Sequence, residues 1–244
     1  MDPKAQPHYP TDLTDRQWAH LAPLLPESGS TPGGRGRPRS TDLRQTLNGL
    51  FYLVKTGCPW RYLPRHYGPW QTLYDYFNRW SRAGIWRELM EEMNLAERRR
   101  QGRHEEPSAG CVDSQSVKTA CQPRWNIGFD GFKRIKGRKR HILTDTLGLL
   151  LCVVVTAAHV DDRKGLRALM QCWFIRGVCR LRCLWADGVY ESQALRQWLW
   201  SLKGTYNIRL HISRHRGAGF QVLPRRWVVE RTFAWLGAYL SHPA

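Results

Sequence analysis

The sequence has few acidic residues and no long apolar run. Asp and Glu number 20 against 38 Lys and Arg, which gives a formal net charge of +18 at pH 7. Such a charge does not fix a fold, but it favours partners that carry phosphates or an anionic lipid surface. The longest mostly apolar run, residues 147–160, is shorter than the roughly 20 residues that cross a bilayer and contains Gly148 and His159. We therefore expect no membrane-spanning helix.

Cysteine patterns typical of metal sites or disulfides are also missing. The seven Cys form no CxxC pair, and no His pair stands beside them. Small buried side chains in a reducing compartment are the simplest interpretation, with a zinc site as the alternative. The residues after Met1 begin no apolar signal segment, so we expect a cytoplasmic protein.

The first part of the chain has the periodicity of helices. Apolar residues recur at helical spacing over 13–25, 43–54 and 70–80, and Gly57 and Gly84 follow the last two segments. A further helix is expected over residues 85–93, and Ser40 is the expected N-cap of the helix that contains residues 43–54. Together these segments predict an all-helical domain over residues 1–95.

Two of these helices, joined by a short turn, fit a helix-turn-helix, in which the second helix presents a polar face to DNA. Arg79 lies on that polar face. A plain helical bundle would give the same pattern, and the basic composition favours the DNA-binding interpretation.

A charged segment over residues 96–107 is the expected domain boundary. Beyond it, in residues 108–244, the pattern changes to alternating strands and helices, which predicts a mixed α/β sheet with helices packed on it. Strands are expected over 109–117, 140–145, 149–157, 178–186 and 206–212, and helices over 164–174, 191–202 and 226–240.

Three carboxylates, Asp113, Asp187 and Glu230, lie where apolar runs of this second part meet polar sequence. Converging carboxylates can hold two Mg²⁺ ions about 4 Å apart and so promote phosphodiester cleavage. From the residues alone, each of the three could instead be a turn or cap residue. Other acids of the same type are equal candidates: Asp75, Asp130, Asp145, Asp161, Asp162 and Glu191.

Basic residues gather near two of these carboxylates. Arg225, Arg226 and Arg231 flank Glu230, and Arg226 could either pair with Glu230 along a helix or hold a phosphate. A second run is either a solvated face or a contact to a DNA backbone. It comprises Lys133, Arg134, Lys136, Arg138, Lys139 and Arg140.

Several strings carry a resemblance to a known family. They are VDSQSVKT at 112–119, KGRKRH at 136–141, DTLGLL at 145–150 and RRWVVERTFAWL at 225–236, preceded by LTDRQW at 13–18 and GCPWR at 57–61. In this order they resemble the DDE-type transposases of bacterial insertion sequences, over roughly residues 11–240.

The resemblance implies an RNase H-like catalytic core over residues 108–244, preceded by a DNA-binding domain. It identifies Asp113, Asp187 and Glu230 as the catalytic, metal-binding triad, with two Mg²⁺ or Mn²⁺ ions. It also implies double-stranded DNA as the partner, both the terminal inverted repeats of the element and the target. At least a homodimer in a synaptic complex, associated with the bacterial nucleoid, follows from the same resemblance.

The sequence departs from the family pattern near its end. Arg226 matches the Arg that precedes the Glu, but Leu223 stands where the family has Tyr, and Gly237 where it has Lys. The chain stops at Ala244, where members commonly continue, so we expect a copy truncated at its C-terminus. The main alternative to strand cleavage and transfer is therefore a decayed copy that only binds DNA. A junction-resolving nuclease and an RNA-binding protein are further alternatives.

Overall fold

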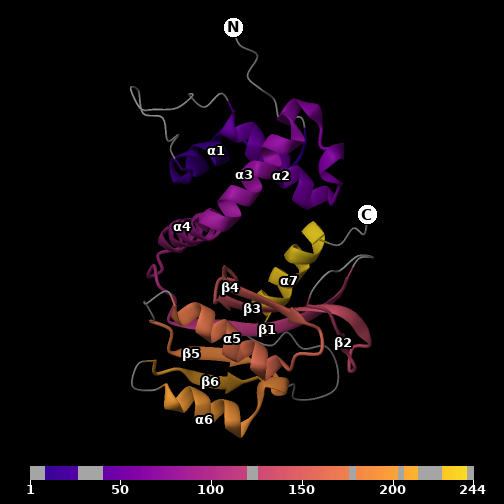
Figure 1. The fold of residues 1–244 in the computed structure, drawn as a ribbon. Helices are drawn as coiled ribbons and strands as arrows, with labels where there is room; N and C mark the ends of the chain where they lie inside the picture. The colour runs from indigo at the N-terminus through magenta and orange to yellow at the C-terminus, as the bar shows by residue number, and fades with distance from the viewer. Residues whose placement is uncertain are drawn as a thin grey trace. The chain divides into compact units, whose positions relative to one another are not determined.

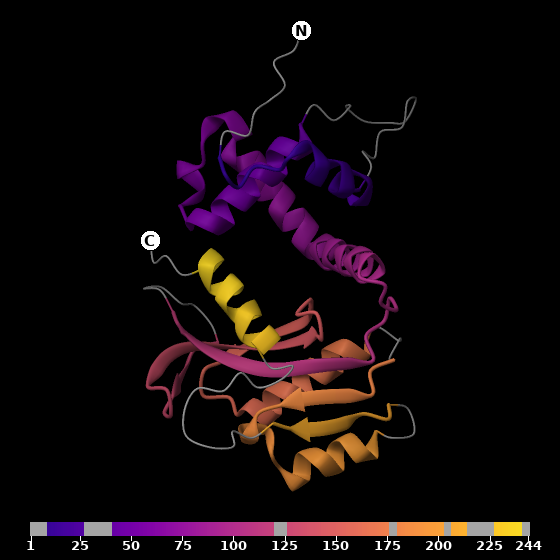
Figure 2. The ribbon, with the colours of Figure 1, turned by 180° about the vertical axis from the view of Figure 1, so that it is seen from behind.

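The computed structural model describes most of the chain. The described residues are 9–26, 41–119, 126–175, 180–202, 206–213 and 227–240. They belong to two compact units, one formed by Met1–Met93 with Gly237–Ala244 and the other by Asn94–Leu236 (Figures 1 and 2). No helix within these residues is long and apolar enough to span a membrane.

The first unit is helical, as the periodicity predicted. Two of its helices end at glycines in the left-handed conformation, Gly57 with φ 65° and Gly84 with φ 78°. The predicted N-cap Ser40 lies outside the described residues, and Asp42 caps the second helix by accepting the backbone N–H groups of Arg44 and Gln45. The elements are α1 (Asp15–Leu21), η1 (Ala22–Leu24), α2 (Leu43–Thr56), η2 (Trp60–Tyr62), η3 (Arg65–Tyr67), α3 (Trp70–Ala83) and the first part of α4 (Ile85–Arg100).

Close packing of α2 against α3 forms the core of this unit. Leu47, Leu73 and Trp80 are each at most 3 % exposed. Gly49 of α2 lies so close to α3 that an added Cβ would meet Leu73 Cδ2 at 2.3 Å. A side chain at this position would force the two helices apart, so the glycine sets their separation.

Helix α4 differs from the prediction, because it continues through residues 94–100 to Arg100. This stretch contains no Gly or Pro, and its Leu, Ala, Glu and Arg residues are good helix formers, so nothing in it ends the helix. Arg98, in the segment predicted to be a charged boundary, is buried. Its guanidinium forms an ion pair with the fully buried Asp145, and its Nε donates to the carbonyl of His104 over 2.8 Å.

The second unit contains a mixed six-stranded sheet in the order β2-β3-β1-β5-β6, with β4 paired to β3. β1, β3 and β4 are antiparallel neighbours, whereas β5 and β6 run parallel to β1. This is the fold class that the sequence predicted. The strands are β1 (Ala109–Lys118), β2 (Gly128–Asp130), β3 (Ile135–Asp145), β4 (Leu150–Ala157), β5 (Cys183–Ala186) and β6 (Arg209–Ile212).

Strand β3 is longer than predicted. It begins at Ile135 and therefore includes most of the basic run, and β2 was not predicted at all. The basic residues were not predicted as part of a strand because they lack the alternation of apolar and polar residues. Long basic side chains can nevertheless occupy both faces of a strand when an acidic partner or solvent is available. The predicted hairpin between β3 and β4 is confirmed, and Gly148 takes the positive φ of 86° in its turn.

Alternate residues of β1 and β3 enter two different cores, one on each face of the sheet. Val112 and Leu143 pack with α5 (Asp162–Phe174) and α6 (Gln193–Ser201) on the face that we call the α5 face. Cys111 and Ile142 pack with α7 (Trp227–Leu240) on the other, the α7 face. Figures 1 and 2 show these helices on opposite sides of the sheet. The face on which each polar residue lies follows from this alternation.

Candidate active site

Asp113 and Asp187 occupy matching positions on neighbouring parallel strands. Cys111 of β1 pairs with Trp185 of β5, and each aspartate lies two residues beyond its member of this pair. Cys111 and Trp185 both contact the core on the α7 face. Because side chains alternate along a strand, both carboxylates also belong to the α7 face, and neighbouring strands are only about 4.8 Å apart. The fold therefore brings Asp113 and Asp187 side by side.

Local hydrogen bonds fix the backbone at each aspartate. Asp113 Oδ1 accepts the backbone N–H of Ser114 over 2.7 Å. Asp187 Oδ1 accepts the N–H of Val189 over 3.0 Å and so caps the short helix η4 (Gly188–Tyr190). The cap interpretation of Asp187 is thus correct locally, and it is compatible with a further role, since both aspartates are partly exposed.

Tyr190, at the end of η4, is 1 % exposed, and its pKa responds to nearby acidic residues. Burial raises the pKa of Tyr190 well above its usual value, and the charges of Asp113, Asp162 and Asp187 raise it further. Three carboxylates thus affect the pKa of the same hydroxyl. The sequence predicted Asp113 and Asp187 as partners but did not group Asp162 with them. No local motif connects residues 162 and 190 with Asp113, so only the fold reveals this grouping.

A buried ion cluster lies on the α5 face, directly beneath this region. Lys139 Nζ is 3.1 Å from Asp162 Oδ1 and 3.6 Å from Asp130 Oδ2, and it donates to the carbonyl of Val160 over 3.0 Å. Two serines of β1 tie the strand to the cluster: Ser114 Oγ donates to Asp162 over 2.6 Å, and Ser116 Oγ donates to Asp130 over 2.5 Å. Lys139 was predicted to contact DNA, but its side chain is only 8 % exposed, so it does not belong to the basic surface.

Most of the rival acids have identified structural partners of their own. Asp145 is paired with Arg98, and Asp161 caps α5 through the N–H of Arg163. Asp130 and Asp162 neutralise Lys139, as a buried cation requires. The two remaining rivals are exposed: Asp75 lies in the helical unit, and Glu191 lies four residues beyond Asp187.

Glu230 lies in the first turns of α7, on the helix that packs against the α7 face, but its own side chain is exposed. The neighbouring Val228 and Val229 are the residues that contact the sheet. Among the described residues, no three His, Cys, Asp or Glu side chains are gathered into a group that could hold a metal ion. The register thus puts Asp113 and Asp187 on one face of the sheet, and in the described part of the chain they form no three-residue metal group with Glu230. Two carboxylates still suit Mg²⁺, which often binds one or two of them and keeps several waters.

Two arginines lie on the same face as the aspartate pair. Gln115 pairs across strands with Arg140, and Val117 with Arg138, so both arginines extend the α7 face beyond Asp113. Burial lowers the pKa of the Arg140 guanidinium from its usual value. Arg140 Nη1 and Gln115 Oε1 are buried and have no hydrogen-bond partner within the described part of the chain. A half-buried guanidinium of this kind is suited to bind an anion.

The other predicted DNA contacts are spread over several places. Lys133, Arg134 and Lys136 are exposed at the start of β3, and Arg79 is exposed on α3 with its guanidinium 5.2 Å from the Tyr76 ring centroid. Arg225 and Arg226 lie outside the described residues.

Arg231 has a structural role in fastening α7 to the sheet. Its Nη2 donates to the carbonyl of Leu147 over 2.5 Å, and its guanidinium carbon lies 4.4 Å and 4.7 Å from the ring centroids of Trp227 and Trp235. A Cβ added at Gly148 would come within 2.4 Å of the same Nη2, so the hairpin turn and Arg231 fit each other closely.

Comparison with known proteins identifies the family. Residues 104–242 match the family model described as "Transposase DDE domain", which covers more than half of the chain. The chain belongs to the DDE transposase family. Residues 13–90 of this DDE transposase also match a second family model, described as "Putative transposase of IS4/5 family". The family predicted from the sequence is thus confirmed.

Curated relatives match parts of this transposase. A Burkholderia cepacia protein named "Putative transposase for insertion sequence element IS402" is 36 % identical over 106 residues, 41 % of this chain and 49 % of that protein. An uncharacterized protein of Sinorhizobium fredii is 33 % identical over 78 residues, 32 % of this chain and 59 % of its own length. An uncharacterized 16.2 kDa protein of IS402 is 30 % identical over 112 residues, 43 % of this chain and 72 % of its own. The chain spans about half the length of the first of these relatives.

Proposed function

We propose that this DDE transposase binds the terminal inverted repeats of an insertion element, cleaves a DNA strand at each end and transfers the freed 3′ end into target DNA. The observation that carries the proposal is the register of β1 and β5, which places Asp113 and Asp187 side by side on one face of the sheet. Arg140 and Arg138 extend the same face on the neighbouring strand. Metal-binding oxygens and phosphate-binding guanidinium groups thus share one surface, as phosphodiester chemistry requires.

Asp113 and Asp187 would hold the divalent ions, with Glu230 of α7 as the third ligand. Two Mg²⁺ or Mn²⁺ ions would supply an activated attacking oxygen and stabilise the leaving oxygen. The role of the protein is to orient these ligands on rigid strands, and the Lys139–Asp162 pair supports this role by tying Ser114, next to Asp113, to the start of α5. Arg140 would hold a phosphate of the strand being cut.

The remaining basic residues would position the DNA. The helical domain over residues 1–95 would recognise the inverted repeat, with Arg79 on the exposed face of α3. Lys133, Arg134 and Lys136 would contact the backbone near the catalytic face, and Arg225 and Arg226 the backbone near Glu230. Joining two element ends would require at least a homodimer.

The decisive experiment is cleavage of a duplex that carries the terminal repeat, with the wild-type chain and the Asp113→Asn variant, in Mg²⁺ and in Mn²⁺. Asn keeps the size of the side chain but removes the charge, so we expect duplex binding to persist and strand nicking to disappear. Glu92→Gln, at an exposed position of α4 to which no DNA contact is assigned, is the matched control and should nick normally. Nicking by Asp113→Asn at the wild-type rate would contradict the proposal.

A DNA-binding protein without catalytic activity is the second candidate, and the exposed position of Glu230 favours it. This candidate predicts salt-sensitive binding of the repeats with no nicking by the wild-type chain in either metal. Glu230→Gln would then have no effect, whereas an active enzyme should lose nicking when Glu230 is replaced.

A further inference from the structure

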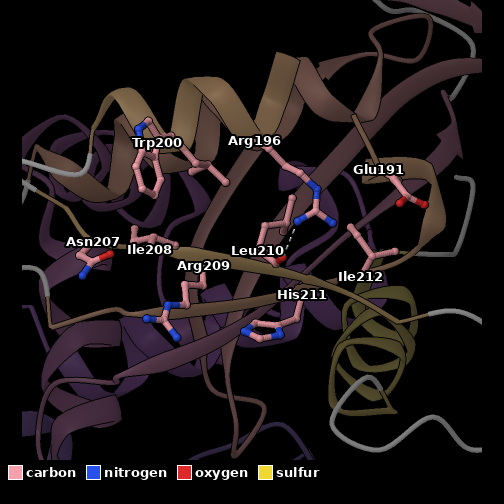
Figure 3. Close-up of a pocket in the computed structure, with 10 residues that line it drawn as sticks. Glu191, Arg196, Trp200, Asn207, Ile208, Arg209, Leu210, His211 and Ile212 are labelled. Carbon is pink, nitrogen blue, oxygen red and sulfur yellow. Dashed lines mark hydrogen bonds between the residues drawn. The ribbon is translucent and has the colours of Figure 1, made fainter. Parts of the chain in front are cut away.

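A groove runs along the edge of β6 that does not pair with β5 within the described residues. In the sheet, β5 lies between β6 and β1, the strand that carries Asp113. The volume of the groove is about 690 Å³, and it lies between β6 and α6 (Figure 3). Among the described residues, β6 pairs only with β5, so one edge of this strand is open to the groove. The open edge and the polar lining make the groove a candidate binding site. Its lining residues do not include Asp113, Asp187 or Glu230.

The groove carries more positive than negative charge, and a large aromatic ring lies at its side. Arg196 and Trp200 extend from α6 toward β6, whereas Arg209 and His211 extend from β6 on the side away from α6 (Figure 3). Glu191 is the acidic side chain among the lining residues. Trp200 is 68 % exposed, so its ring is accessible to a ligand in the groove. Guanidinium groups beside an exposed aromatic ring are the combination that binds single nucleic-acid strands.

The open edge of β6 is poorly suited to accept another β-strand. Residues 209 and 213 direct their backbone N–H groups to β5, so the backbone groups of Leu210 and Ile212 face the groove. Arg196 Nη1 reaches the carbonyl oxygen of Leu210 at 3.5 Å, where a further strand would have to bond. A charged side chain in this position protects a sheet edge from strand addition. The lining therefore favours a ligand bound through its phosphates and bases over a protein strand.

The groove is continuous with the face that carries the aspartate pair. Trp185 pairs with His211 across strands, and their rings are 6.3 Å apart, so His211 and Arg209 lie on the α7 face with Asp113 and Asp187. Glu191, at one end of the groove, follows Asp187 by four residues. A DNA strand that leaves the aspartate pair toward β6 would thus enter the groove after crossing one strand, about 5 Å.

We propose that the β6 groove binds a single DNA strand adjacent to the cleavage site, with one base stacked on Trp200 and phosphates held by Arg196, Arg209 and His211. This inference rests on the proposed function, because it assumes that the chain acts on DNA. The proposed ligand is an unpaired DNA strand, and the residues that would bind it are not the proposed metal ligands.

The test is fluorescence anisotropy of the full chain with a labelled oligonucleotide of about 16 nucleotides and with a duplex of the same sequence, in the absence of divalent metal. Trp200→Leu should weaken single-strand binding about tenfold, whereas Trp200→Phe, which keeps an aromatic ring, should retain most of the affinity. Arg209→Ala should reduce the slope of log affinity against log salt by about 0.7 for the single strand. Duplex affinity should change little in all three variants.

Two controls keep the result interpretable. Arg103→Ala removes a charge at an exposed position that does not line the groove, and it should leave the single-strand salt slope unchanged. Thermal unfolding should be the same for Trp200→Leu and wild type, because the ring is largely exposed. Equal single-strand affinity for Trp200→Leu, Trp200→Phe and wild type would overturn the proposal, as would a change of oligomeric state in Trp200→Leu with unchanged oligonucleotide binding.

Failure of the catalytic proposal would look different. Asp113→Asn should bind the single strand as tightly as wild type, because the binding measurement contains no metal and the groove residues are intact. Wild-type single-strand binding without any nicking would refute cleavage and leave the groove assignment standing.

Discussion

Lys139 Nζ and Ser114 Oγ meet at the same oxygen, Asp162 Oδ1, at 3.1 Å and 2.6 Å. Lys139 belongs to β3, Ser114 to β1 and Asp162 to the first turn of α5, so this oxygen joins two strands and a helix. Asp113 directly precedes Ser114 and faces the opposite side of the sheet. The contacts of Asp162 on the α5 face thus hold β1 in place, and β1 presents Asp113, the proposed catalytic carboxylate, on the α7 face.

Replacing Lys139 should destabilise the fold strongly. Lys139→Met keeps the length of the side chain but leaves the buried Asp130 carboxylate and the partly buried Asp162 carboxylate without their cation. We expect a loss of about 3–5 kcal/mol in the free energy of unfolding, measured by urea denaturation. Lys118→Met, at an exposed position on β1, is the matched control and should change it by less than about 0.5 kcal/mol. A loss below about 1 kcal/mol for Lys139→Met would mean that this lysine is solvated and available to DNA.

Stability should fall as the pH is lowered below neutrality, because of His141. This histidine is fully buried beneath α5, and burial lowers its pKa to about 4, although the charge of Asp162 opposes the shift. The unfolded chain, with the ordinary pKa near 6.5, binds the proton more readily than the folded one between pH 6.5 and 4, so acid favours unfolding.

Between pH 7 and pH 5 this difference amounts to about 2 kcal/mol. Urea denaturation at the two pH values measures it, and His141→Gln should flatten the dependence. If the wild-type chain is equally stable at pH 7 and pH 5, His141 is not held neutral in the fold.

The Arg98–Asp145 pair should show strong coupling. Arg98→Met alone leaves Asp145 charged and fully buried, although its Oδ1 still accepts the N–H groups of Leu147 and Leu149. We expect a loss of about 3–5 kcal/mol from the single variant. Adding Asp145→Asn, which removes the charge, should recover a part of it. Denaturation of Arg98→Met, Asp145→Asn and the double variant gives the coupling energy. Additive losses from the two single substitutions would contradict a direct ion pair.

Arg140 should contribute to duplex binding by the α7 face. Arg140→Gln removes one cation from the row that extends beyond Asp113, so the slope of log duplex affinity against log salt should become shallower by about 0.9. Fluorescence anisotropy over a salt series measures the slope, and Arg103→Gln controls for the change in net charge. An unchanged slope would show that Arg140 contacts no phosphate.

Replacing Tyr190 should separate metal binding from folding. Tyr190→Phe removes only the hydroxyl, whose pKa is raised by burial and by the charges of Asp113, Asp162 and Asp187. Residues next to metal ligands typically change metal affinity by tenfold or more, so we expect the Mg²⁺ concentration at half-maximal nicking to rise about tenfold. Tyr206→Phe is the control, because the Tyr206 ring stacks on Phe174, with 3.7 Å between the ring centroids, and is not one of the residues grouped with the aspartates. A normal Mg²⁺ requirement in Tyr190→Phe would limit this tyrosine to packing.

Sequence patterns predicted local features well and burial poorly. The helix ends at Gly57 and Gly84 were predicted correctly, because a positive φ is a property of a single residue. Lys139 was predicted to contact DNA together with the other cations of the basic run. In a run of cations the sequence does not show which side chains point to which face, and among the cations of β3 only Lys139 lies on the α5 face. The end of α4 was missed, because a charged stretch without Gly or Pro can still be helical.

By itself, the sequence determined the family, the helical and mixed α/β organisation, and the set of acids from which a metal site can be built. Those features depend on residue type and on spacing within one segment. Only the tertiary structure decided which acids have partners and which share a face, because pairing between β1 and β5 joins residues more than 70 positions apart. It separated Asp113 and Asp187 from Asp130, Asp145 and Asp162, since the last three carboxylates pair with Lys139 or Arg98, whereas Asp113 and Asp187 lie on the α7 face.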